Sequence, residues 1–244
     1  MAASYFPAQS GTGTNLTGSA VTTISVTLNP ITPGQAVCIF CGGFGNSAMP
    51  TMSVADNVTG NTYTFVDSAQ DTTSSAWGAC NTFYGLNINN FPTFLTATFS
   101  YGLAYAWILV DVFNGILTSG ALDGFNTNFQ TFPSTGADAI TSGTFSPAHA
   151  GDLIWGCTID EISSGTDVHG TGFTEGQYTG SGSYYSEYKL SGASGSQAVT
   201  FTNSTNAGSG WFLTGGFALR TAPFVYTPPR PATRYFPGYS ILRP

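Results

Sequence analysis

The acidic side chains have the clearest capacity for chemistry in this sequence, and there are few of them: 12 in 244 residues. Glycosidases built on β-sandwiches place two carboxyl groups so that they flank one glycosidic bond. The adjacent Asp160 and Glu161 do not meet this requirement, because neighbouring residues of a strand point to opposite faces. Asp56 with Asp67, or Asp160 with Glu175, form pairs only if the fold brings them together. We therefore expect no catalytic carboxylate pair.

The two histidines, His149 and His169, are the only candidates for the base of a hydrolytic triad. His149 lies in a turn that precedes an apolar run, and His169 lies in the glycine-rich stretch 165–172. Neither accompanies a G-x-S-x-G nucleophile elbow between a strand and a helix. We expect that the protein is not an enzyme, and we predict no catalytic residue and no cofactor.

The segment Asp56–Asn61 offers the oxygen donors that a calcium ion binds. It lacks the several acidic ligands of an EF-hand loop. A hairpin explains the same residues, because Gly60 and Asn61 tolerate a positive φ. We predict the hairpin and no metal, with calcium as the alternative.

The cysteines are four in number, and two of them have a zinc-like spacing. Cys38 and Cys41 lie in the apolar run 36–41, which is typical of a buried strand, and residues three apart on a strand face opposite sides. A zinc site would need a second pair of ligands. We predict that these two, with Cys80 and Cys157, are buried free thiols; a disulfide and a metal site are the alternatives.

Apolar and polar residues alternate with period two along much of the chain, as in Ile24, Val26 and Leu28, which predicts β-strands. Charged residues make up only 7%, too few for surface helices with Glu–Lys pairs. We expect an all-β fold, an antiparallel jelly-roll-like β-sandwich. The predicted strands are 21–29, 35–43, 61–67, 76–86, 94–101, 105–114, 151–159, 183–190, 196–203 and 209–220.

A weak internal repeat divides the chain. Residues 33–41 resemble 150–158, and the run Trp107–Phe113 resembles Trp211–Phe217, in the same order. We predict two similar half-units that share one large two-sheet core; a small sandwich closed by each half-unit alone is the alternative. Their predicted bounds are about 18–114 and 138–220, with 115–137 as the connection.

Charge is distributed unevenly between the two ends of the chain. Residues 1–219 carry 12 acidic residues and one basic residue, a net charge of −11, whereas residues 220–244 carry four arginines and no acid. The overall charge of −7 argues against nucleic acid as a partner, because binding to phosphates requires cations. No apolar run reaches the roughly 18 residues that span a bilayer, so we expect no membrane partner.

The C-terminal segment 221–244 has the composition of an extended arm. Its six prolines remove backbone donors, and its aromatic residues and arginines are types enriched at interface cores. We predict that it docks on an identical subunit or another protein of the same particle; a disordered tail and an arm that packs on its own sandwich are the alternatives. A shorter N-terminal arm, 1–17, contains Tyr5-Phe6-Pro7. The predicted partner-binding residues are Phe224, Tyr226, Arg230, Arg234, Tyr235, Phe236, Tyr239 and Arg243.

Several aromatic residues near predicted loops have a second interpretation. They either pair within the core or form a platform for stacking on a surface glycan. These residues are Trp77, Tyr84, Tyr178, Tyr184, Tyr185 and Tyr188.

Short turn motifs carry a resemblance to a known group. The runs Val54–Asp56 and Gly60–Thr64, with Ala150–Ile154 further on, resemble those of uncharacterised β-sandwich structural proteins of tailed phages and bacteria, over roughly 20–220. The resemblance implies a virion or surface-exposed structural protein without catalytic residues. We expect a capsid decoration (cement) protein or a tail or fibre component, made in the host cytoplasm since no signal peptide is present. A glycan-binding module is the alternative, and a secreted glycan-active enzyme is a weaker one.

Overall fold

A computed structural model describes residues 3–46, 50–71, 77–132, 136–160, 167–178, 184–206 and 210–223. Within these ranges the chain forms β-strands and a single 3-10 helix, Pro7–Gln9, and contains no α-helix. The all-β prediction is confirmed. Nothing helical in the described ranges is long and apolar enough to cross a membrane.

The first half of the chain forms two antiparallel sheets. The larger has the order β1-β9-β4-β7-β6, with β2 also paired to β9, and the smaller has the order β3-β8-β5. The bounds are β1 Ser4–Tyr5, β2 Gly11–Asn15, β3 Val21–Thr27, β4 Ala36–Asn46, β5 Met52–Asp56, β6 Tyr63–Gln70, β7 Trp77–Gly85, β8 Phe94–Leu103 and β9 Tyr105–Asn114.

The second half repeats this arrangement. Its larger sheet has the order β10-β17-β12-β15-β14, and its smaller sheet has the order β11-β16-β13. The bounds are β10 Leu122–Phe132, β11 Gly136–Thr141, β12 Asp152–Asp160, β13 Asp167–His169, β14 Thr174–Tyr178, β15 Tyr184–Gly192, β16 Thr200–Asn206 and β17 Gly210–Leu219.

The strand order of each half is jelly-roll-like. In the first half, β2 pairs with β9, β9 pairs with β4, and β4 pairs with β7. In the second half, the equivalent pairs are β10 with β17, β17 with β12, and β12 with β15. The internal repeat is therefore a repeat of topology. The prediction that 115–137 is only a connection is wrong in part, because β10 lies inside this range. Strand β10 is an edge strand of the larger sheet of the second half.

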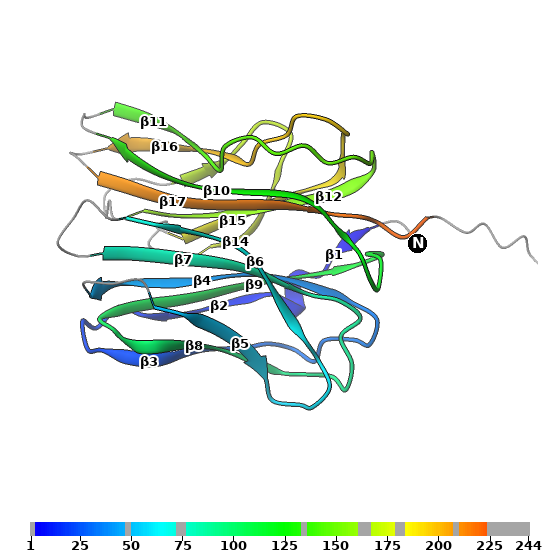
Figure 1. Cartoon of the computed structure of the whole chain (residues 1–244), viewed down its shortest axis with the longest axis horizontal. Coiled ribbons are helices and arrows are strands. Elements are labelled where there is room, and N and C mark those ends of the chain that lie inside the picture. Colours follow the sequence, from blue (N-terminus) through cyan, green and yellow to red (C-terminus); the bar gives the residue numbers. More distant parts are fainter. Residues whose placement is uncertain are drawn as a thin grey trace, which may run out of the picture.

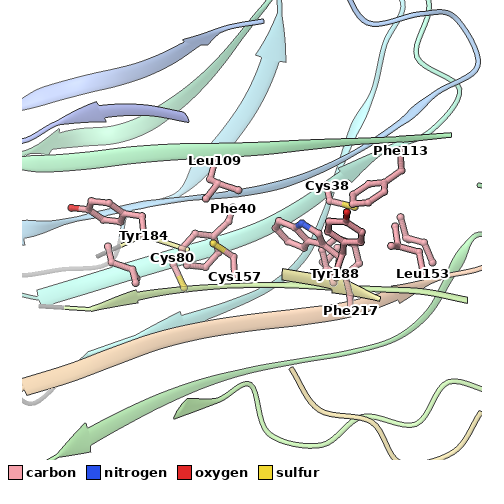
Figure 2. Close-up of a cluster of buried hydrophobic side chains, with 14 of the residues drawn as sticks. Cys38, Phe40, Cys80, Leu109, Phe113, Leu153, Cys157, Tyr184, Tyr188 and Phe217 are labelled. Carbon is pink, nitrogen blue, oxygen red and sulfur yellow. The ribbon is translucent and has the colours of Figure 1, made fainter. Parts of the chain in front are cut away.

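The four sheets stack in layers, with the two larger sheets facing each other (Figure 1). The core between them takes Phe40, Trp107 and Phe113 from the first half and Trp155 and Phe217 from the second. Figure 2 shows part of this shared core. Each half also has a core of its own under its smaller sheet. The expectation of one large two-sheet core is therefore only part of the arrangement, since the shared core is accompanied by a separate core in each half, as the alternative of two small sandwiches would have.

Strand β9 shows why the middle layers form. Trp107 and Leu109 face the shared core, whereas Ile108 and Val110 face the core of the first half. A strand buried on both faces has a nearly continuous apolar sequence, and β17 has the same character. These two runs therefore mark the strands that lie between cores.

All four cysteines are buried free thiols, as predicted. Cys38, Cys80 and Cys157 lie in the shared core, and Cys41 faces the core of the first half. The first three are labelled in Figure 2. Burial raises the pKa of Cys80 to about 12, so these side chains behave as small apolar groups.

The described part of the N-terminal segment, from residue 3 onward, belongs to the body, contrary to the predicted arm at 1–17. Ser4 and Tyr5 pair with β9, as does β2. Tyr5 packs against the shared core, where its ring lies 4.6 Å from that of Tyr188. An edge strand of the first larger sheet therefore explains this segment without a partner.

Candidate functional site

The eight predicted partner-binding residues, which run from Phe224 to Arg243, lie outside the described residues. The structure does describe the segment that leads to them. Thr221 forms a β-bridge with Ile116, and the N–H of Ala222 donates to the carbonyl of Gly115 at 2.7 Å. Residues 221 and 222 therefore belong to the β body, contrary to the prediction of an arm that begins at residue 221.

The surface of the body is less acidic than the sequence suggests. The acidic residues Asp71, Asp111, Asp152, Asp167 and Glu187 are buried. Desolvation raises the pKa of Asp167 to about 7 and that of Glu187 to about 8. The net charge of −11 counted for residues 1–219 therefore overstates the negative charge that faces solvent near neutral pH.

The Asp56 carboxylate organises a turn. Its Oδ1 accepts the N–H of Val58 at 3.0 Å, and its Oδ2 accepts the side-chain N–H of Asn61 at 2.6 Å and the hydroxyl of Tyr63 at 2.5 Å. Gly60 has a φ of 97°, as expected for a turn. The predicted hairpin is wrong, however, because β5 and β6 belong to different sheets.

Among the described carboxylate candidates, Asp56, Asp67 and Glu175 are each engaged with other groups. Asp67 lies 2.9 Å from the hydroxyl of Thr127 on β10, and Glu175 accepts a hydrogen bond from the hydroxyl of Tyr185. The Asp56 carboxylate accepts hydrogen bonds within its own turn. The side chain of Asp160 lies outside the described part of the structure.

Most of the aromatic residues considered for a glycan platform lie in the interior. Tyr184 and Tyr188 belong to the shared core, Tyr84 packs against it, and Tyr185 belongs to the core of the second half. Tyr178 is 54% exposed and stacks on Tyr185 with ring centroids 5.8 Å apart. The side chain of Trp77 lies outside the described residues.

A fully buried carboxylate, Asp111, links the two larger sheets. Its Oδ2 accepts the indole N–H of Trp155 at 2.7 Å and the hydroxyl of Ser186 at 2.6 Å, and its Oδ1 accepts the hydroxyl of Tyr5 at 2.9 Å. Burial raises the pKa of Asp111, while these three hydrogen bonds act to lower it. A network whose donors are all neutral and internal is structural, because it presents no group to a substrate.

The second buried carboxylate of interest, Asp152, lies in a cluster with Asp123 and His149. One potential ligand atom from each of the three residues lies within 4.8 Å of the others. Asp123 Oδ2 lies 2.9 Å from the Nδ1 of His149 and also accepts the backbone N–H of His149 at 2.9 Å. Asp152 is 2% exposed, and its Oδ2 receives no hydrogen bond.

Irregular pairing at the end of β17 brings these residues together. Leu219 of β17 pairs with Leu122 on one side and with Leu153 on the other. Asp123 is the extra residue of a bulge in β10, and Asp152 pairs with Gly192 where the register of β15 shifts. Bulges redirect side chains and occur often beside functional sites.

The turn before β12 positions His149. Gly151 adopts a φ of 89°, a conformation that residues with a Cβ rarely adopt. Its carbonyl accepts the hydroxyl of Thr221 at 3.0 Å, which connects the turn to the segment after β17. The cluster therefore lies beside the last described residues of the chain, and the His149 side chain, 48% exposed, gives it access to solvent.

Two carboxylates, one imidazole and the nearby Arg220 set the electrostatics of the cluster. Burial and the neighbouring Asp123 carboxylate raise the pKa of Asp152 to about 6, although Arg220 acts to lower it. Burial also acts to raise the pKa of Asp123, but hydrogen bonds from His149 outweigh it, and the net shift is downward. Two carboxylates in contact require either a shared proton or a cation.

The sequence analysis did not connect these three residues. Asp123 and His149 are 26 positions apart, and Asp123 falls in the stretch interpreted as a connection. His149 makes no side-chain hydrogen bond in the described part of the chain other than that to Asp123, so the pair lacks the nucleophile of a triad. His169 lies on β13, with its ring Nδ1 3.2 Å from the carbonyl of Gly170.

Comparison with known proteins returns no matching family model, curated protein or solved structure. The resemblance to β-sandwich proteins of tailed phages and bacteria therefore rests on the short motifs of the sequence. The class that the fold defines is an all-β protein of two jelly-roll-like halves.

Proposed function

We propose that this protein is a non-enzymatic structural subunit of a virus particle, either a capsid decoration protein or a component of a tail or fibre. In this proposal the β body is the scaffold and residues 224–244 anchor it to a neighbouring subunit. The observation that carries the proposal is that the described β body, which runs to Pro223, already contains three buried apolar cores, and that the aromatic and arginine-rich segment follows it in the sequence.

The composition of this segment supports an anchoring role. Its 21 residues include three arginines, five aromatic residues and five prolines. Prolines reduce the conformational entropy that is lost when an extended segment docks. Aromatic residues and arginines supply most of the binding energy at interfaces. Fully extended, the segment reaches at most about 75 Å, enough to cross an adjacent subunit.

The fold is compatible with this role and also with the alternative. Jelly rolls occur in viral capsid proteins and in lectins. The glycan-binding alternative loses support from Tyr84, Tyr184, Tyr185 and Tyr188, because these side chains lie in the cores or against them. The subunit proposal does not depend on those residues.

Deletion of residues 224–244 tests the proposal. The truncated chain, residues 1–223, keeps the bridge of Thr221 to Ile116 and the hydrogen bond of Ala222, so we expect it to fold. Full-length protein should sediment as an oligomer, and the truncated chain as a monomer with an unchanged circular dichroism spectrum.

A double variant distinguishes a specific anchor from a segment that associates non-specifically. Arg230→Glu with Arg234→Glu should weaken assembly by at least about tenfold, since arginines at interface cores make charge-assisted hydrogen bonds. The matched control, Thr227→Ala with Thr233→Ala, changes the same segment without altering its charge. Normal assembly of the truncated chain would refute the proposal.

A further inference from the structure

We propose that Asp123, His149 and Asp152 bind a divalent transition metal ion of the zinc type, at the point where β17 ends. The proposal rests on the described β body alone and does not depend on the function proposed for the arm.

The first argument is the unsatisfied carboxylate oxygen. Asp152 Oδ2 is buried and receives no hydrogen bond from an N–H group or a hydroxyl, and its carboxyl group lies against the Asp123 carboxyl group in a cluster that also contains an imidazole. A buried acceptor without a donor is costly, and a buried carboxylate more so. A bound cation would satisfy this oxygen and would also remove the repulsion between Asp123 and Asp152.

The second argument is geometric. The three ligand atoms lie within 4.8 Å of one another. Ligands bound to zinc at about 2.0 to 2.2 Å are roughly 3 to 3.5 Å apart, so small rotations of the side chains would complete the site. Three protein ligands leave one position for water. Solvent can reach that position on the side of His149, because its imidazole is half exposed.

The ligand types decide the class of metal. One imidazole and two carboxylates suit zinc and similar transition metals, whereas calcium prefers oxygen ligands alone and more of them. Arg220 acts against any cation, since its charge also reaches Asp152. This opposing charge leads us to expect moderate affinity, in the micromolar range.

The experiment uses full-length protein without a histidine tag, treated with a chelator and then dialysed. Zn²⁺ chloride is titrated by isothermal calorimetry, and the thermal midpoint is measured with and without the ion. We expect saturable binding of a single ion per chain. At free Zn²⁺ about one hundred times Kd, the midpoint should rise by roughly 5 to 10 °C.

Three variants locate the site. Asp152→Asn and His149→Ala should each weaken Zn²⁺ binding by at least about tenfold. His169→Ala removes the other histidine and should bind as the wild type does. His149 is half exposed, so its replacement should leave the fold intact even if Asp152→Asn does not.

The outcomes are distinct. Absence of saturable Zn²⁺ binding would overturn the proposal and leave a shared proton between the two carboxylates. Unchanged binding in His149→Ala would place the ion elsewhere, and tighter binding of Ca²⁺ than of Zn²⁺ would contradict the proposed class. None of these results bears on the arm, so failure here is distinguishable from failure of the proposed function.

Discussion

The indole of Trp155 in β12 donates a hydrogen bond to the carboxylate of Asp111 in β9 across 2.7 Å, and this contact joins the two halves of the molecule. Ser186 of β15 donates to the same oxygen at 2.6 Å. Apolar side chains allow two sheets to slide over each other, whereas a buried acceptor with fixed donors favours one relative position. We infer that Asp111 fixes how the larger sheets dock.

The replacement Trp155→Phe tests this inference. It leaves Asp111 with fewer donors in a buried site, which should lower the free energy of unfolding by about 1–3 kcal/mol beyond the loss of packing. Trp211→Phe is the matched control, because the indole N–H of Trp211 is buried without a partner. Urea denaturation measures both, and equal losses would show that the hydrogen bond contributes nothing.

A glycine beside the same network provides a second prediction. A Cβ at Gly176 would lie 2.3 Å from Ser186 Oγ and 3.0 Å from Asp111 Oδ2. Gly176→Ala should therefore push the network apart and destabilise the fold by about 1–3 kcal/mol. In the control, Gly11→Ala, the two nearest atoms are the methyl ends of Leu28 and Val26, which can move. A smaller loss for Gly176→Ala than for Gly11→Ala would contradict the prediction.

Stability should fall as pH rises from mildly acidic to neutral values. Burial raises the pKa of Asp167 to about 7, from an ordinary value of 3.8. Its Oδ1 accepts a hydrogen bond from Asn203 at 2.9 Å, and Oδ2 has no partner. A group whose folded pKa is raised stabilises the fold at low pH, and this contribution disappears between about pH 4 and pH 7.

The variant Asp167→Asn isolates this contribution. It keeps the acceptor for Asn203 but cannot ionise, so the loss of stability between pH 4 and pH 7 should become shallower, by up to about 1.4 kcal/mol per pH unit. Glu187, whose pKa burial raises to about 8, should maintain part of the slope in both proteins. An identical pH profile for wild type and variant would show that Asp167 does not contribute to the pH dependence of stability.

The thiols give a test of the shared core and of the core of the first half. All four cysteines are free and buried, so a thiol reagent should modify none of them quickly in the native protein. All four should react in denaturant without reductant. Fewer than four reactive groups in denaturant would mean that a disulfide forms, and rapid reaction of the native protein would mean that the core opens.

The strands of the middle layers could be predicted from the sequence because burial on both faces leaves a dense apolar run. All ten predicted strands overlap observed ones, including β9 and β17. Strand β10 was missed because its sequence is mostly polar. An edge strand needs few apolar residues, and Phe125 of β10 remains exposed.

The candidate metal site could not be predicted for a different reason. No local pattern links Asp123 to Asp152, since they lie on either side of β17 and meet only through the sheet order β10-β17-β12. The register shifts at Leu122/Gly124 and at Asp152/Ile154 leave no residue signature beyond a glycine. The sandwich class can be predicted from the alternation of apolar and polar residues along the sequence. The position of a cluster such as this one depends on the register of strand pairing, which the sequence does not reveal.

The most direct test of the anchoring role is a cross-linking measurement on mixed subunits. A photoreactive phenylalanine analogue replaces Tyr235, and light and isotopically heavy chains are unfolded, mixed and assembled together. The account predicts cross-links between heavy and light chains, from position 235 of one chain to the β body of another. Cross-links confined to single chains would contradict it, because the arm would then pack on its own body.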